Sequence, residues 1–224
     1  MMKKMPLYGK EKCVMTIFWD WNGTLVADVD LVVKVNNLVF AQHGYRDTSA
    51  EEYRRLFRFP VREYYYALGV TPEDFKVIAK EWNEQYVAHF SEAPLAPGVL
   101  EALRRFKAAG FRQVIISASQ VDQLRAQVAS FPELEGMFDE VLGLSDVYAV
   151  SKVQLAQDYL SRSGVNPEDA AFLGDTDHDA EVARAIGCRC FLISGGHQED
   201  AVLAKAAGAQ VLADIAQLYP ILGV

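Results

Sequence analysis

The spacing of five short apolar runs constrains the fold of this chain more than any other feature of its sequence. Each run is too short for a helix, and most are rich in β-branched or aromatic residues, which is typical of strands. Most lack polar/apolar alternation, as expected of parallel strands that are covered on both faces. The five predicted strands span residues 14–19, 114–116, 141–144, 170–173 and 190–193.

Helix-like stretches lie between the later strands. Apolar residues recur at helical spacing over residues 98–109, 152–163 and 179–186, and each stretch ends at a glycine, which is a common C-terminal cap. Strands that alternate with helices of this length indicate βαβ units. The sequence therefore predicts an α/β fold with a doubly wound parallel sheet.

One interval breaks this rhythm, because about ninety residues separate the first predicted strand from the second, far more than an ordinary crossover helix needs. The pattern there is helical: one helix is expected over residues 30–43, and another opens at Thr71 with Pro72 in its first position. The apolar stripe of this second helix is Phe75, Ile78, Ala79, Trp82 and Tyr86. We therefore predict an α/β core over residues 1–27 and 97–224, with a helical cap inserted at 28–96.

Charge and composition limit the partners of the chain. Thirty acidic and 22 basic side chains give a formal net charge of −8, which argues against a general affinity for nucleic acid or for an anionic membrane. No apolar run reaches the roughly 18–20 residues that span a bilayer, and the three cysteines form no C-x-x-C motif. A cytoplasmic protein is expected, and nothing in the sequence indicates its oligomeric state.

Residues suited to catalysis follow the predicted strands. Ligands of an open parallel sheet bind beyond the carboxyl ends of its strands. The segment DWNGTL begins at Asp20 after the first strand, Ser117 follows the second, Lys152 opens the helix after the third, and GDTDHD follows the fourth. All of these segments are expected to meet in one crevice.

These side chains together indicate metal-assisted phosphoryl transfer. The carboxylates of Asp20, Asp175 and Asp179 suit a hard cation such as Mg²⁺, which prefers oxygen ligands. Such a cation would screen their repulsion and leave Asp20 free to attack phosphorus. Ser117 and Lys152 would hold the phosphoryl oxygens, with Lys152 as a point charge. The partner expected is a small phosphorylated metabolite.

The order of these motifs resembles that of the haloacid dehalogenase superfamily, specifically its phosphoglycolate-phosphatase-like branch. The motifs are DWNGTL, Ser117 after VII, Lys152, and GDTDHD followed by AEVARAIG, while PLAPGVLEAL is similar to the return from that family's cap. The resemblance implies Asp20 as nucleophile and Mg²⁺ held by the carboxylates of Asp20 and Asp175 and by the main-chain oxygen of Asn22. It also implies that Asp179 supports the metal shell or Lys152.

The departure from the family pattern is Asn22. Phosphatases of this family usually have an aspartate there, which protonates the leaving oxygen and then activates water. An amide can do neither, so the sequence predicts slow turnover that Asn22→Asp would raise. Asn22 also precedes Gly23, a dipeptide that is prone to deamidation and that would thereby yield the aspartate.

Three interpretations of Asn22 remain open. The enzyme is a slow or narrowly specific phosphatase, or it cleaves phosphonates, or it binds phosphate without hydrolysis. Phosphonate-cleaving relatives need a cap lysine, whereas residues 58–62 offer only Arg58 and Arg62. Metal-free dehalogenation is disfavoured, because the clustered carboxylates would repel one another without a cation.

Further candidates for substrate binding are Thr24, in the first motif, and Arg58 and Arg62, in the cap. The cap arginines alternate with acidic residues, which favours a solvated helix face of mixed charge. His178, between Asp175 and Asp179, is the nearest candidate in the sequence for the proton donor that Asn22 cannot provide. His197 follows the fifth strand, where a loop-capping role is expected.

Overall fold

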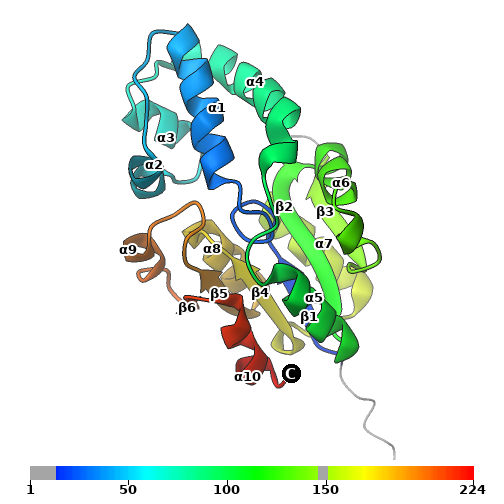
Figure 1. The fold of residues 1–224 in the computed structure, drawn as a ribbon. Helices are drawn as coiled ribbons and strands as arrows, with labels where there is room; N and C mark the ends of the chain where they lie inside the picture. Colours follow the sequence, from blue (N-terminus) through cyan, green and yellow to red (C-terminus); the bar gives the residue numbers. More distant parts are fainter. Residues whose placement is uncertain (1–13, 146–150) are drawn as a thin grey trace, which may run out of the picture.

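A parallel sheet of six strands in the order β3-β2-β1-β4-β5-β6 forms the centre of the molecule (Figure 1). The structure, a computed structural model, describes residues 14–145 and 151–224. The strands are β1 (Thr16–Trp19), β2 (Arg112–Gln120), β3 (Glu140–Leu144), β4 (Ala170–Gly174), β5 (Arg189–Ile193) and β6 (Ala209–Leu212). The predicted doubly wound α/β fold is confirmed.

Helices cover both faces of the sheet because the side chains of each strand alternate between them. Phe18 of β1 packs in a core with α7 and α8, whereas Ile17 and Trp19 pack in a second core with α5 and α10. The helices of this part of the chain are α5 (Val99–Ala108), α6 (Val121–Ala129), α7 (Lys152–Ser163), α8 (Asp177–Ile186), α9 (Asp200–Leu203) and α10 (Leu218–Leu222). The fully buried strands explain why the sequence showed apolar runs without alternation.

The strand prediction was correct in position but incomplete. All five predicted strands are present, although the first begins at Thr16 and the last strand, β6, was not predicted. Strand β2 also continues past the predicted end at Ile116 to Gln120, with a shift in its register against β3 over this stretch. Ser117 therefore lies within an irregular part of β2 rather than in a loop.

Between β1 and α5, four α-helices lie together above the carboxyl ends of the strands (Figure 1). They are α1 (Val29–Gln42), α2 (Ala50–Leu56), α3 (Arg62–Ala67) and α4 (Pro72–His89). The whole interval was predicted to be helical, but only α1 and the start of α4 were located from the sequence. Helix α4 begins as expected, with Pro72 in its first turn and the Thr71 side chain accepting a hydrogen bond from the Asp74 amide. We call these helices the cap.

Two adjacent chain segments connect the cap to the sheet. Val26 forms an isolated antiparallel bridge with Leu95, the Ala27 amide donates to Pro94 at 2.9 Å, and the Ala96 amide donates to Leu25 at 2.9 Å. We call residues 25–27 and 94–96 the hinge segments. The predicted cap, residues 28–96, begins directly after the first hinge segment and ends with the second. This division of the chain into core and cap stays a prediction.

No helix in the described part of the chain has the length and hydropathy needed to cross a bilayer. The cytoplasmic location stays a prediction from composition.

Candidate active site

Three buried carboxylates meet where β1 and β4 end. Asp20 follows β1 directly, Asp175 follows β4, and Asp179 lies in the first turn of α8. One carboxylate oxygen of each residue lies within 4.8 Å of the others. Three acidic groups brought this close and withdrawn from water suit an oxygen-coordinated cation. The structure thus brings the three predicted carboxylates together, and their role as metal ligands stays a prediction.

The ammonium group of Lys152 joins two of these carboxylates. Lys152, the first residue of α7, lies 2.5 Å from Asp20 Oδ1 and 2.5 Å from Asp179 Oδ1, and only 4% of its side chain is exposed. The second oxygen of Asp20, Oδ2, accepts no hydrogen bond from any donor in residues 14–145 and 151–224. This oxygen is therefore open to a cation or to an electrophile.

The charges of the cluster do not balance. Burial away from water, together with the charges of Asp179 and Asp175, raises the pKa of Asp20 to about 8 despite the adjacent Lys152. Burial and the charge of Asp179 likewise raise the pKa of Asp175 to about 6. Burial would raise the pKa of Asp179 as well, but the Lys152 ammonium and the hydrogen bonds from Lys152 and Thr176 hold it below its ordinary value. One ammonium thus stabilises Asp179 but leaves Asp20 and Asp175 in need of further positive charge.

The start of α8 fixes the position of Asp179. Its Oδ2 accepts hydrogen bonds from the backbone amides of Asp175 and Thr176 and from the Thr176 hydroxyl, at 2.7–3.1 Å. Gly174 makes this arrangement possible, since a Cβ there would lie 2.2 Å from Asp179 Cγ. The capping of α8 therefore also aims the other oxygen of Asp179 at Lys152.

Asp175 is held by the loops on either side of it. Its Oδ1 accepts a hydrogen bond from the Thr24 hydroxyl at 3.0 Å, and its Oδ2 accepts one from the His197 backbone amide at 2.6 Å. A Cβ on Gly196 would lie 2.3 Å from that Oδ2. Thr24 thus contacts a carboxylate of the cluster, and its predicted role in substrate binding stays a prediction.

Ser117 and Ser119 line the neighbouring edge of the site, from the irregular part of β2. Ser117 Oγ accepts a hydrogen bond from the Ser119 amide at 3.1 Å and lies 3.1 Å from Ser119 Oγ. The Ser119 hydroxyl in turn donates to Asn22 Oδ1 at 3.1 Å. The serines thus connect β2 to the loop that carries Asp20.

Asn22 contacts a second buried polar group that sequence reasoning missed. Asn22 Nδ2 donates to Asp28 Oδ2 at 2.8 Å and to the Tyr86 hydroxyl at 2.6 Å. Asp28 is fully buried, and it also accepts from the Gly23 amide and the Tyr86 hydroxyl. Asp28 directly follows the first hinge segment, and Tyr86 belongs to α4, so the cap reaches residue 22 directly.

His197 completes this group from the core side. Its Nε2 lies 3.2 Å from Asp28 Oδ1, and its Nδ1 lies 2.8 Å from the Tyr53 hydroxyl of α2. Burial opposes ionisation of His197, but the charge of Asp28 prevails and raises the pKa of His197 to about 9. In turn, the charge of His197 holds the pKa of Asp28 below its ordinary value, although burial would raise it. This buried ion pair goes beyond the loop-capping role expected of His197.

Neither of the two predicted cap arginines has a side-chain contact with the carboxylate cluster among those found in the described residues. Arg58 is exposed and donates to the Leu56 carbonyl at 3.1 Å, and Arg62 is exposed 3.6 Å from Glu63. His178 is paired with Glu181, and its ring lies tilted against Phe59 with 4.7 Å between the ring centroids. Their predicted roles stay predictions.

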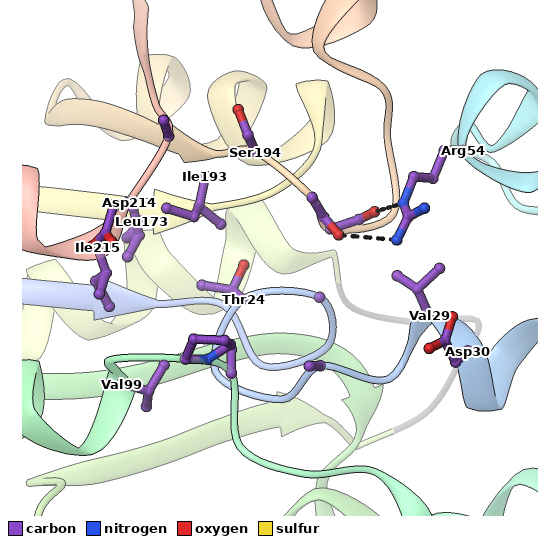
Figure 2. A pocket seen from close by; sticks show the side chains of 17 residues that line it. Thr24, Val29, Asp30, Arg54, Val99, Leu173, Ile193, Ser194, Asp214 and Ile215 are labelled. Atoms are coloured by element: carbon purple, nitrogen blue, oxygen red, sulfur yellow. Dashed lines mark hydrogen bonds between the residues drawn. The ribbon is translucent and has the colours of Figure 1, made fainter. Parts of the chain in front are cut away.

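Arg54 is the cap arginine that reaches the core. It donates from Nε to the Gly196 carbonyl at 3.0 Å and from Nη2 to the Gly195 carbonyl at 3.3 Å, and the two bonds are drawn in Figure 2. Figure 2 also shows the residues that line the cavity beside Arg54. This cavity has a volume of about 230 Å³, is lined in part by Thr24, and lies between the hinge segments and the ends of β5 and β6. Arg54 therefore links the cap to the loop that holds Asp175.

We expect the fold to protect Asn22 from deamidation, which requires the Gly23 nitrogen to attack the Asn22 side-chain carbonyl carbon. The Gly23 amide is bound to Asp28 Oδ1 at 2.8 Å, and the Asn22 amide is held by Asp28 and Tyr86. Peptide mapping after storage should find intact Asn22 in folded protein and aspartate or isoaspartate in protein stored in denaturant. Equal rates of conversion in both samples would contradict this protection.

Known proteins are similar to this chain over most of its length. The family model for haloacid dehalogenase-like hydrolases matches residues 17–193, which is most of the chain. Phosphoglycolate phosphatase 1 of Pseudomonas aeruginosa is 26% identical over 218 residues, covering 91% of this chain and 78% of the relative. The phosphoglycolate phosphatase of Synechococcus elongatus is 22% identical and covers 86% of this chain and 90% of the relative.

Solved structures share the fold. A haloacid dehalogenase-like family hydrolase of Streptococcus pneumoniae superimposes with a TM-score of 0.82 at 21% identity, covering 94% of this chain and 99% of the other. A point mutant of CbbY from Rhodobacter sphaeroides, solved with xylulose-1,5-bisphosphate, gives a TM-score of 0.71 at 24% identity, covering 92% of this chain and 96% of the other.

Proposed function

The chain belongs to the haloacid dehalogenase-like hydrolase family, and we propose that it is a Mg²⁺-dependent phosphatase that hydrolyses a small phosphomonoester through Asp20. The observation that carries this proposal is the contact of Lys152 with Asp20 and Asp179 inside a cluster of three buried carboxylates. Positive charge for phosphoryl oxygens, ligands for a cation and an open carboxylate oxygen occur together there. The curated relatives described above are named phosphoglycolate phosphatases, so phosphoglycolate heads the esters to be tested.

The reaction proceeds in two displacements at phosphorus. Asp20 Oδ2 forms a bond to phosphorus as the ester P–O bond breaks, and the leaving oxygen takes its proton from solvent because the Asn22 amide is not acidic enough to supply one. Water then attacks the phosphorus of the aspartyl phosphate, which releases inorganic phosphate and restores the carboxylate. Lys152 and Ser117 hold the phosphoryl oxygens, and the cap closes over the substrate.

The oxygen donors present fit Mg²⁺: the carboxylates of Asp20 and Asp175 and the main-chain carbonyl of Asn22 would hold it, with Asp179 supporting the site through Lys152. When bound, the cation would neutralise the acidic cluster and polarise a phosphoryl oxygen. The excess of negative charge in the cluster supports this assignment.

Binding of Mg²⁺ should raise the melting temperature of the protein, because the cation binds only the folded arrangement of carboxylates. Asp175→Asn should abolish the Mg²⁺-induced shift while leaving the metal-free protein at least as stable, since it removes one repelling charge. Differential scanning fluorimetry with and without millimolar Mg²⁺ measures both. Asp122→Asn, which alters an exposed acid at the start of α6, is the control, and a shift that persists in Asp175→Asn would contradict the metal assignment.

Binding of a phosphorylated metabolite without hydrolysis is the second candidate function, and the amide at Asn22 favours it. A metabolite-binding module would retain the phosphate site and lack turnover. The phosphonate alternative finds less support, because the cap lysines Lys34, Lys76 and Lys80 are all exposed, whereas a Schiff-base lysine needs a desolvated site.

Turnover of an activated aryl phosphate in the presence of Mg²⁺ tests the proposed function. The parent should release phosphate, and a screen of phosphate esters that includes phosphoglycolate should then identify its preferred substrate. Absence of turnover in the parent with every ester, while phosphate still binds, would establish the binding module instead.

A further inference from the structure

Tyr86 belongs to the cap, yet its hydroxyl touches the loop that carries Asp20. Its ring is held firmly on α4, stacked on Trp82 at 4.8 Å between centroids and in edge contact with Phe90 at 5.9 Å. The hydroxyl lies 2.6 Å from Asp28 Oδ2 and 2.6 Å from Asn22 Nδ2. Packing of the aromatic ring alone would not require either polar contact.

Hydrogen-bond polarity decides how these groups face one another. Asp28 accepts from the Gly23 amide, which can only donate. The single hydroxyl hydrogen of Tyr86 points at Asp28 Oδ2, so Tyr86 offers residue 22 only a lone pair. Residue 22 therefore meets two acceptors on this side, and only an NH₂ group satisfies both.

The orientation of the Asn22 amide follows from these two acceptors. Its nitrogen faces Asp28 and Tyr86, so its carbonyl oxygen must face the opposite way, where the Ser119 hydroxyl donates to it. Ser119 contacts Ser117, at the edge of the phosphate site. Residue 22 therefore presents a hydrogen-bond acceptor to the side of the site where the serines lie.

We propose that Tyr86 is a positioning residue for the phosphatase reaction: from the cap, it sets the Asn22 amide so that the carbonyl oxygen faces the side of the site where Ser117 and Ser119 lie. This inference rests on the proposed function. An acceptor at residue 22 cannot protonate a leaving group, but it can orient a donor, such as the attacking water or a substrate hydroxyl. Cap closure then supplies the contact that sets this orientation.

A matched control exists within the cap. Tyr64 is also a buried tyrosine, and its hydroxyl accepts a hydrogen bond from Asn36 Nδ2 at 2.9 Å, with both partners inside the cap. Tyr64→Phe and Tyr86→Phe thus each remove one buried hydroxyl bonded to an asparagine amide. Only Tyr86→Phe affects residue 22.

Steady-state kinetics on an aryl phosphate with Mg²⁺ tests the proposal. Tyr86→Phe should lower kcat about five- to tenfold, the value of one hydrogen bond, and leave KM within about twofold. Tyr64→Phe should change neither constant. In an Asn22→Ala background, Tyr86→Phe should have no further effect on kcat, because no amide remains to be oriented. Equal kcat for the two tyrosine variants, or the same factor for Tyr86→Phe in both backgrounds, would overturn the proposal.

A second measurement does not depend on turnover. Hydrogen exchange of the Asn22 side-chain amide, followed by NMR, should be slow in the parent and in Tyr64→Phe and clearly faster in Tyr86→Phe. Unchanged exchange in Tyr86→Phe would overturn the positioning role even in a protein without activity. A parent that lacks turnover but shows the expected exchange pattern would instead refute the proposed function alone.

Discussion

Replacing Asp20 with asparagine is expected to lower phosphatase turnover by at least about three orders of magnitude, as loss of a catalytic nucleophile does elsewhere. Asp20 Oδ2 is the carboxylate oxygen of the cluster that no described hydrogen-bond donor engages, and an amide of the same shape cannot form the aspartyl phosphate. The measurement is kcat on an aryl phosphate at saturating Mg²⁺. Asp122→Asn serves as the control, and an Asp20→Asn variant within tenfold of the parent would contradict the nucleophile assignment.

Unfolding will not account for that loss. Asp20 is one of three buried carboxylates, and burial and its acidic neighbours raise its pKa to about 8. Neutralising it removes repulsion, while Lys152 keeps its contact with Asp179. The metal-free Asp20→Asn protein should therefore melt at or above the temperature of the parent.

Replacing Lys152 with methionine is expected to have the largest effect on stability. The ammonium is buried between Asp20 and Asp179, so its removal leaves buried carboxylates without their partner, at a cost of about 3–5 kcal/mol in the free energy of unfolding. Mg²⁺ should restore part of this stability by binding the same acids. Turnover should stay lost in Mg²⁺, because the phosphoryl oxygens lack the lysine charge.

Urea unfolding of the variant in chelator and in Mg²⁺ measures both effects. Lys34→Met, which removes the exposed ion pair with Glu92, is the control and should cost less than about 1 kcal/mol. A Lys152→Met protein as stable as the parent in chelator would show that the lysine is not balancing the acidic cluster.

The sequence predicted the parts of the site that follow from strand ends. Asp20, Asp175 and Lys152 each follow an apolar run, and parallel strands bring their carboxyl ends to one edge, so their convergence needed no knowledge of side-chain packing. The buried strands and the glycine-capped helices were predicted from apolar runs, helical spacing and capping residues, which likewise need no knowledge of side-chain packing. Strand β6 was missed, because its residues are only half-buried over most of its length.

The contacts of Asp28 with Asn22, Tyr86 and His197 could not be predicted, because they depend on how the cap packs on the core. Tyr86 lies 58 residues from Asp28, and in the sequence it was one position in the apolar stripe of α4. Periodicity predicts that a ring is buried, but it does not predict the partner of a hydroxyl. His197 likewise had no visible acidic partner in the sequence.

Because Asn22 contacts Asp28 and Tyr86, Asn22→Asp alone is not expected to raise turnover. A carboxylate at residue 22 would meet Asp28 Oδ2 and the Tyr86 lone pair, both acceptors. The single substitution therefore places two acidic groups in one buried contact. Turnover should rise only when Asp28→Asn accompanies Asn22→Asp, since the pair then keeps one amide and one carboxylate.

Transfer of phosphate to Asp20 is tested most directly by acid quench during turnover followed by peptide mapping. Dephosphorylation should be slow without an acid/base group at residue 22, so the aspartyl phosphate should accumulate. We expect a peptide phosphorylated on Asp20 in the parent, and no such peptide in Asp20→Asn. Turnover in the parent with phosphate on another side chain, or undiminished turnover in Asp20→Asn, would contradict it.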